Sequence, residues 1–295
     1  MTARPLVIDT DPGKDDAVAI LSAFGAPADL DVILITTVGG NVPLTQTTAN
    51  ALKLCELAGR QDIPVHAGCP AALLQPSNVV YNIHGDDGLG GVPLPAPTMV
   101  IADGHAVSAL IDAIRKSPDP VTIAALAPLT NIAIALTMSP AIIGNIREIV
   151  VMGGSFSGGN ITPYASYNMH SDPHAAQIVF ASGAPVTMVG LEITRQAMPT
   201  PEWLALLHDT GQPGARFVAD LWDNPTLCFN DACVTGYVLA PELYRCEPMH
   251  VDIELNDSVQ VGRTRRGNGK PNINVAVGFD RNGFFDLMSR TLGSI

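Results

Sequence analysis

The sequence has few of the residues that build a disulfide framework or a zinc site. Five cysteines occur in 295 residues, an odd number, and no two of them form a Cys-x-x-Cys pair. Secreted domains held by disulfides and structural zinc sites both need paired, closely spaced cysteines. The cysteines are therefore expected to be small buried hydrophobic residues in a reducing compartment.

Positive charge is also scarce. The chain has 16 Lys and Arg against 28 Asp and Glu, a formal net charge of −12, and charged residues make up only 15% of it. This balance argues against nucleic acid and anionic membrane surfaces as partners. There is no run of eighteen apolar residues and no basic-then-apolar segment at the start, so neither membrane spanning nor secretion is expected. A compact, acidic, cytoplasmic enzyme fits these features.

Aspartate, by contrast, is concentrated near the N-terminus. Four aspartates fall within residues 9–16, directly after the apolar run 6–8. Carboxylates packed this closely repel one another and titrate as a coupled set unless a cation or fixed donors compensate them. A hard divalent metal ion is the simplest compensator, although Asp15 and Asp16 also stand where they could stabilise the start of a helix.

Two other interpretations of this segment can be tested on its spacing. An EF-hand loop needs Gly at its sixth position and Glu at its twelfth, whereas counting from Asp9 places Gly13 fifth and Ile20 twelfth, so an EF-hand is excluded. The pair formed by Asp9 and Asp11 resembles the start of a haloacid-dehalogenase-type phosphatase. That family has Thr or Val where this chain has Gly13, so the phosphatase remains a minor alternative.

Apolar strand-like runs alternate with helix-like segments along most of the chain. Strands are expected at residues 6–8, 32–38, 64–67, 121–126, 149–152 and 186–189, and helices at 17–21, 45–58, 106–114, 129–136 and 173–181. Because these strands are too uniformly apolar to face water, the pattern predicts an α/β fold with a parallel sheet covered by helices on both faces. No linker of low complexity divides residues 1–295, so one domain is expected.

Two long loops and one polar strand pair are expected outside this alternation. The loops span residues 70–97 and 156–171, and loops of this length in a compact domain tend to be functional. The strand pair is expected between residues 251–255 and 272–279, with the basic segment 263–267 between them as a solvated face.

Polar residues follow the expected strands, and in a parallel sheet such residues meet at the edge where ligands bind. They are Asp11, Asp15 and Asp16 after the first strand, Asn41 after the second, and segments 126–131 and 152–155 after later ones, with Asn160 and Asn168 in the second loop. Carboxylates and amides suit a neutral polyhydroxylated ligand with a hard metal ion. A phosphate ligand is not expected, because no Gly-x-x-x-x-Gly-Lys motif or dinucleotide fingerprint is present.

The segment 9–20 resembles the signature of the calcium-dependent inosine-uridine nucleoside hydrolases, and the similarity extends through nearly the entire chain. Further matching segments occur in the same order at residues 37–41, 83–85, 128–133, 151–154, 168, 172–173 and 270–272. The resemblance implies the nucleoside hydrolase fold, an α/β fold with an open, mostly parallel central sheet, helices on both faces and a Rossmann-like core. It further implies a Ca²⁺ cofactor and a homodimer or homotetramer. It also implies an N-glycosyl hydrolase that splits purine or pyrimidine ribonucleosides into ribose and free base during nucleoside salvage.

The resemblance also implies roles for individual residues. The expected Ca²⁺ ligands are Asp11, Asp16, the main-chain carbonyl of Leu126 and Asp231. The residues expected to bind ribose are Asp15, Asn41, Met152 through its carbonyl, Asn160 and Asn168, with His84 lining the base side. Asp9 would support the metal ligands. The metal would activate a water, and Asp11 would take the proton as that water attacks the anomeric carbon.

At two positions this chain departs from the family's pattern. Asn230 stands where the family usually has the His that protonates the leaving base, and an amide cannot donate a full proton. Ser166 stands where the family commonly has a Glu that helps to bind the ribose 5′-hydroxyl. An altered substrate preference is therefore expected, and His170 or Tyr167 could compensate from the same loop.

Three explanations of these departures stay open. Hydrolysis could proceed with another acid or with hydrogen bonding to the base alone, or the substrate could be a glycoside with a different 5′ side. Alternatively, the protein could bind a nucleoside or ribose with little or no turnover. Because every expected metal ligand is present, hydrolysis is the preferred interpretation.

Overall fold

The computed structural model describes residues 3–74, 83–222 and 227–295. Its centre is an eight-stranded sheet with the order β3-β2-β1-β4-β5-β6-β10-β7, and its strands pair in parallel except for β10 with β7. The strands are β1 (Arg4–Thr10), β2 (Leu30–Thr37), β3 (Val65–Ala67), β4 (Val121–Ala125), β5 (Ile146–Met152), β6 (Val186–Val189), β7 (Tyr244–Met249) and β10 (Ile273–Phe279). The predicted open, mostly parallel sheet is confirmed.

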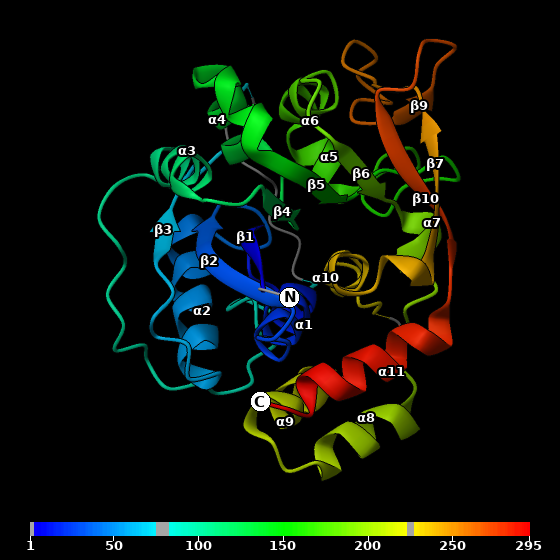
Figure 1. The fold of residues 1–295 in the computed structure, drawn as a ribbon. Helices are drawn as coiled ribbons and strands as arrows, with labels where there is room; N and C mark the ends of the chain where they lie inside the picture. Colours follow the sequence, from blue (N-terminus) through cyan, green and yellow to red (C-terminus); the bar gives the residue numbers. More distant parts are fainter. Residues whose placement is uncertain (1–2, 75–82, 223–226) are drawn as a thin grey trace.

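Helices cover both faces of the sheet (Figure 1). One face packs against α1 (Lys14–Phe24), α2 (Leu44–Leu57), α9 (Pro213–Leu221), α10 (Ala232–Leu239) and α11 (Arg281–Leu292). The other face packs against α3 (Ala106–Lys116), α4 (Thr130–Met138) and α6 (Pro173–Phe180). The remaining helices are α5 (Tyr167–Ser171), α7 (Leu191–Thr194) and α8 (Pro201–Asp209), with 3-10 turns at Pro140–Asn145 and Pro241–Leu243.

The uniformly apolar strands of the sequence form because both faces of the sheet are buried. In β1, Leu6 and Ile8 belong to the core on one face while Val7 belongs to the core on the other. Alternate side chains of a strand point to opposite faces, so a strand covered on both sides needs an apolar residue at every position. The polar residues of this segment are therefore displaced to the turn after the strand.

The predicted strand pair between residues 251–255 and 272–279 is wrong. Strand β8 (Val251–Ile253) pairs with β9 (Thr264–Arg266) in a separate two-stranded antiparallel sheet, whereas β10 lies between β6 and β7. The turn between β8 and β9 closes on itself through a hydrogen bond from the Gly262 N–H to the Glu254 carbonyl at 2.8 Å. The chain turns back at this point, so residues 264–266, expected in a basic connection, form a strand that pairs with β8. Arg265 and Arg266 are exposed, as the predicted solvated face requires.

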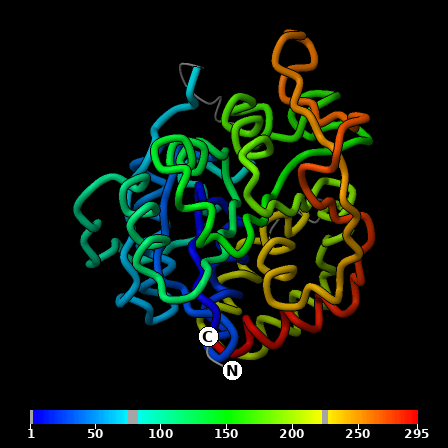
Figure 2. Tube along the Cα trace, turned by 45° about the horizontal axis from the view of Figure 1, so that its top comes forward, coloured from blue at the N-terminus to red at the C-terminus, as the bar shows by residue number. Residues whose placement is uncertain are grey.

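The β8–β9 hairpin extends beyond the rest of the molecule (orange in Figure 2). Of the expected loops, 156–171 ends in the helix α5, and residues 75–82 of the loop 70–97 lie outside the described residues. None of the helices in the described ranges has both the length and the hydropathy needed to cross a lipid bilayer.

Candidate active site

A cavity of about 240 Å³ opens at the carboxyl-terminal edge of the parallel sheet. Residues that end or follow five of its strands line the cavity: Asp11 after β1, Asn41 after β2, Leu126 after β4, Met152 at the end of β5 and Leu191 after β6. Apart from Asp16 and Ser166, every site residue expected from the sequence also lines it. This edge is where open α/β sheets bind ligands.

The turn from β1 into α1 fixes the Asp16 carboxylate. Asp16 lies in the first turn of α1, and its Oδ2 accepts the Gly13 N–H at 2.9 Å. Its Oδ1 accepts the Thr10 hydroxyl at 2.5 Å and the Asp11 N–H at 3.3 Å. Helix N-termini stabilise a carboxylate through free N–H groups and the helix dipole, so this short segment holds Asp16 largely by itself.

Asn41, from the turn after β2, connects Asp11 and Asp16. Its backbone N–H donates to Asp11 Oδ2 at 2.6 Å, while its Nδ2 donates to the Asp11 carbonyl at 3.2 Å and to Asp16 Oδ2 at 3.1 Å. The neighbouring Gly40 approaches so closely that an added Cβ would lie 1.9 Å from Asp11 Oδ2. Only glycine fits at position 40 with Asp11 in this place.

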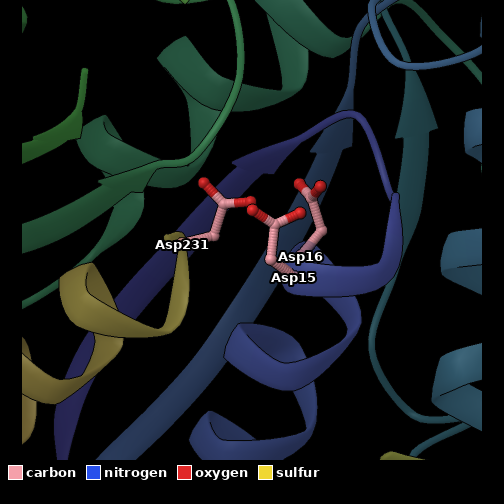
Figure 3. Close-up of side chains that lie close together, drawn as sticks. All are labelled: Asp15, Asp16 and Asp231. Carbon is pink, nitrogen blue, oxygen red and sulfur yellow. The ribbon is translucent and has the colours of Figure 1, made fainter. Parts of the chain in front are cut away.

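Three buried carboxylates meet at this edge of the sheet. Among the residues that the structure describes, Asp15, Asp16 and Asp231 offer oxygens that all lie within 4.8 Å of one another. Figure 3 shows Asp231, at the start of α10, directed toward Asp15 and Asp16 at the start of α1. Asp11, expected as a metal ligand, is outside this group, whereas Asp15, expected to bind ribose, is inside it.

The electrostatics of these carboxylates call for a compensating cation. Burial, reinforced by the negative charge of Asp16, raises the pKa of Asp11 well above its usual range. Burial together with repulsion from Asp15 likewise raises the pKa of Asp16 and of Asp231. In addition, the buried Oδ1 of Asp15 has no hydrogen-bond partner. A divalent cation at this point would offset the repulsion, so the donor set fits a hard metal ion.

The Asp9 carboxylate is bonded to residues of β2 and α4 and not to the groups that hold the Asp16 carboxylate. Its Oδ1 accepts the Thr36 hydroxyl at 2.5 Å and the Asn131 Nδ2 at 2.9 Å, and burial raises its pKa to about 6. These bonds tie β1 to β2 and α4. The Asp9 main-chain carbonyl accepts the Leu126 N–H at 2.8 Å, and the Asp16 carboxylate is bonded to Thr10, which no motif of the sequence indicated.

Asn168 and Asn160 reach the cavity from the segment between β5 and α6. Asn168 Nδ2 donates to the Leu126 carbonyl at 2.6 Å and to the Met152 carbonyl at 3.2 Å. Asn160 Oδ1 accepts the Tyr167 N–H at 2.8 Å, at the first residue of α5. The carbonyls expected to face the metal and the ribose are thus joined by one amide.

Ser166 does not line the cavity. It is 1% exposed, and its hydroxyl accepts the Gly154 N–H at 2.7 Å. Gly154 has φ +82°, which favours glycine, and an added Cβ would lie 2.4 Å from Met188 Sδ. Ser166 therefore holds the tight turn after β5.

In the part of the wall formed by residues 227–231, the Asn230 side chain is bonded to Asp15. Its Nδ2 donates to Asp15 Oδ2 at 2.9 Å and to the Cys228 carbonyl at 3.4 Å. His84 Nδ1 accepts the Lys14 N–H at 3.1 Å and lies 3.8 Å from Asp15 Oδ1.

Of the two residues considered as compensation for the altered positions, one lines the cavity. Tyr167 belongs to the wall. His170 lies elsewhere, with its Nδ1 3.2 Å from the Val261 carbonyl oxygen.

Several residues of the wall were not predicted. They are Lys14, Ile83, Ile161, Leu191, Arg195, Trp222, Leu227 and Cys228. Leu191 follows the expected strand 186–189, so the rule used for the other strand ends would have found it. Arg195 and Trp222 follow α7 and α9, short helices that the sequence pattern did not predict.

Both the sequence and the fold of this chain are similar to those of known proteins. The family model for inosine-uridine preferring nucleoside hydrolase matches residues 6–286. A pyrimidine-specific ribonucleoside hydrolase, RihB, from Escherichia coli O157:H7 is 37% identical, covering 98% of this chain and 96% of that one. The solved structure of a purine-preferring ribonucleoside hydrolase from Gardnerella vaginalis has a TM-score of 0.92 at 31% identity, with 99% of each chain covered. A plant nucleoside hydrolase, PpNRh1, has a TM-score of 0.90 at 32% identity, with 98% of each chain covered.

Proposed function

This chain belongs to the inosine-uridine preferring nucleoside hydrolase family, and we propose that it cleaves ribonucleosides with Ca²⁺ held by its buried carboxylates. It is an N-glycosyl hydrolase that acts on ribonucleosides. The observation that carries the metal proposal is the group of buried carboxylates at the cavity. The phosphatase interpretation is set aside with the family match.

The proposed ligands of the ion are the carboxylates of Asp11, Asp16 and Asp231 and the main-chain carbonyl of Leu126. Asp16 and Asp231 belong to the carboxylate group, and Asp11, Leu126 and Asp231 line the cavity. When bound, a hard divalent cation would neutralise the carboxylates and lower the pKa of a water. Asp15, which also belongs to the group, would stand between the ion site and the ribose.

Asp11 is proposed as the general base. The Asn41 N–H holds its Oδ2 at 2.6 Å, which fixes the orientation of the carboxylate and leaves Oδ1 to accept the proton of the attacking water. A base must lie within hydrogen-bond reach of that water and keep its orientation. Asn41 and the close approach of Gly40 both supply that restraint.

Asp15, Asn41, Asn160, Asn168 and the Met152 carbonyl are proposed to bind the ribose hydroxyls. Breaking the N-glycosidic bond develops positive charge on the sugar, and nearby carboxylates stabilise that charge more in the transition state than in the substrate. The buried, partly unpaired Asp15 carboxylate is suited to this task.

A preference for pyrimidine ribonucleosides is proposed here, and it rests on the name of a relative rather than on the residues of the cavity wall. Asn230 cannot supply a proton to a departing base, and its amide is bonded to Asp15. Asn230 is therefore proposed to orient Asp15 rather than to act as an acid. A relative at 37% identity carries a name that specifies pyrimidine ribonucleosides, whereas a structural neighbour at 31% identity is named as purine-preferring.

The test is a panel of uridine, cytidine, inosine and adenosine, assayed for released ribose before and after removal of metal with a chelator. Release of ribose and free base should require Ca²⁺ and should be fastest with uridine or cytidine. Nucleoside binding measured by calorimetry without any turnover would instead favour a binding protein. Light scattering on the same samples tests the proposed homodimer or homotetramer.

A further inference from the structure

The segment between β5 and α5 starts with a turn held by side chains. Four consecutive backbone N–H groups, those of residues 154–157, donate to side-chain oxygens. The acceptors are Ser166 Oγ for Gly154, Thr264 Oγ1 for Ser155, and Glu192 Oε1 for both Phe156 and Ser157. Because the buried N–H groups of Gly154 and Ser155 need partners, the path of this turn depends on the side chains of Ser166 and Thr264, and Glu192 adds bonds to the less buried Phe156 and Ser157.

Thr264 makes the most complete of these contacts. It is the first residue of β9 and is 2% exposed. Its hydroxyl accepts the Ser155 N–H at 2.8 Å and donates to the Ser155 carbonyl at 2.6 Å. One hydroxyl group thus satisfies both backbone groups of Ser155, which lies 109 residues away in the chain.

The rest of the β8–β9 hairpin packs along the same segment. The guanidinium of Arg266 lies 4.7 Å from the ring centre of Phe156, and that of Arg263 lies 5.5 Å from the ring centre of Tyr164. Gly262 approaches the backbone of His170 so closely that an added Cβ would lie 2.6 Å from the His170 Cα. A hairpin outside the main sheet therefore supports the segment from residue 155 to α5.

This segment carries four residues of the cavity wall, and two of them are amides proposed to bind ribose. Asn160 and Asn168 are these amides, and Asn168 bonds the carbonyls of Leu126 and Met152. Thr264 is absent from the lining, so any effect of Thr264 on a ligand must pass through the segment. Displacements as small as about 1 Å at such groups can lower a reaction rate about 100-fold.

We propose that Thr264 is a positioning residue: by holding Ser155 it sets the place of Asn160 and Asn168 against the ribose. The proposal rests on the proposed function of the cavity. It assigns a role in substrate binding to the β8–β9 hairpin, which contributes no residue to the cavity wall within the described ranges.

The experiment compares Thr264→Val, which keeps the shape but loses the hydroxyl, with Thr264→Ser, which restores it. Thr291→Val serves as the control, because Thr291 is also buried and its hydroxyl donates to the Leu287 carbonyl in α11, away from the cavity. KM and kcat are measured with the best nucleoside of the panel, and amide hydrogen exchange is followed over residues 153–168. We expect Thr264→Val to raise KM about 10-fold and to speed exchange in this segment, and Thr264→Ser and Thr291→Val to match the wild type.

A merely structural role would lower the fraction of folded, active enzyme and leave KM unchanged. An unchanged KM in folded Thr264→Val protein overturns the proposal, whether or not exchange in the segment changes, as does a failure of Thr264→Ser to restore the wild-type values. If the wild type releases no ribose, the proposed function fails. Hydrogen exchange then still decides whether Thr264 holds the segment.

Discussion

Asp11, Asp15 and Asp16 lie on one side of the cavity, the aspartate side, and Asn160, Asn168 and Asn230 lie on the sugar-and-base side. Different kinds of contact hold these two sides in place. On the aspartate side, Asp16 is bonded to groups no more than six residues away in the chain, and one neighbouring turn adds Asn41. On the other side, Ser155 depends on Thr264 and Asn230 bonds an aspartate 215 residues away. The contacts of Asp16 within residues 10–16 are therefore local, whereas those of Asn41, Ser155 and Asn230 join segments far apart in the chain.

The largest expected effect lies on the aspartate side. Asp11→Asn keeps the size of the side chain but removes the proposed base and a metal ligand, so kcat/KM should fall at least about 10³-fold. The measurement is steady-state ribose release at saturating Ca²⁺. Asp209→Asn, at a side chain that is 81% exposed, is the matched control and should retain full activity. Substantial turnover by Asp11→Asn would remove Asp11 from the mechanism.

A gain is expected on the leaving-group wall. Asn230→His introduces a group that can protonate a departing base, so turnover of inosine should rise about 10- to 100-fold. Uridine should change less, and Asn230→Ala, which removes the bonds to Asp15 and to the Cys228 carbonyl without adding an acid, should lose activity on both. If inosine turnover does not rise in Asn230→His, the limitation lies on the sugar side.

A smaller effect is expected at Glu192, which holds the sugar-side turn from α7. Its Oε1 accepts the N–H groups of Phe156 and Ser157 and the hydroxyls of Ser155 and Ser157. Glu192→Gln weakens these charge-assisted bonds, so KM should rise about fivefold with little change in kcat. Glu202→Gln, at an exposed position in the first turn of α8, is the control. An unchanged KM in Glu192→Gln would mean that the charge does not contribute to holding the turn.

The same side chain gives a pH dependence with a defined sign. Burial acts to raise the pKa of Glu192, but hydrogen bonds from Ser157, Ser155 and Phe156 outweigh it and lower the pKa below its ordinary value of 4.5. A lowered pKa in the folded state means that the contribution to stability is fully present above pH 4.5 and is lost as the pH falls through the lower folded value. Thermal unfolding of the wild type should therefore approach that of Glu192→Gln only at the acid end. A difference that stayed constant down to the acid limit would contradict this assignment.

The smallest effect is expected at Ser166. Ser166→Ala removes one buried hydrogen bond to Gly154, which should lower the free energy of unfolding by about 1 kcal/mol and change kcat/KM by less than about tenfold. Ser22→Ala is a matched control, because the buried Ser22 hydroxyl donates to the Ala19 carbonyl at 2.9 Å within α1. A large loss of activity with normal stability would instead indicate direct contact between Ser166 and the substrate.

The sequence predicted the parts of the molecule in which local patterns decide the structure. The strands expected at 121–126 and 186–189 and the helix at 45–58 lie within one residue of β4, β6 and α2 at each end. Short apolar runs bounded by turn residues are typical of strands buried on both faces, and this pattern is contained in neighbouring residues alone. The same logic located Asp11, Asp15 and Asp16 at the turn after β1, and the family resemblance is confirmed.

The rest depends on contacts between distant segments. Strands β7 and β10 contain polar residues and lie at the mixed edge of the sheet, where the partner of each strand is set by packing rather than by its own sequence. The helices α7, α8 and α9 follow one another without strands between them, so no alternation of strands and helices predicts their position. They bring Arg195 and Trp222 to the cavity. Likewise, no feature of Thr264 in the sequence identifies Ser155 as its partner.

The side-chain support of residues 154–157 bears on how this enzyme could be redesigned. A turn that is held by backbone hydrogen bonds of a sheet can be altered only by breaking that sheet. This turn is held by the side chains of Ser166, Thr264 and Glu192, and each of them can be replaced by one substitution. Directed evolution toward new sugars should therefore include these three positions, although none of them lines the cavity. Libraries confined to the wall would miss these three supports of the turn.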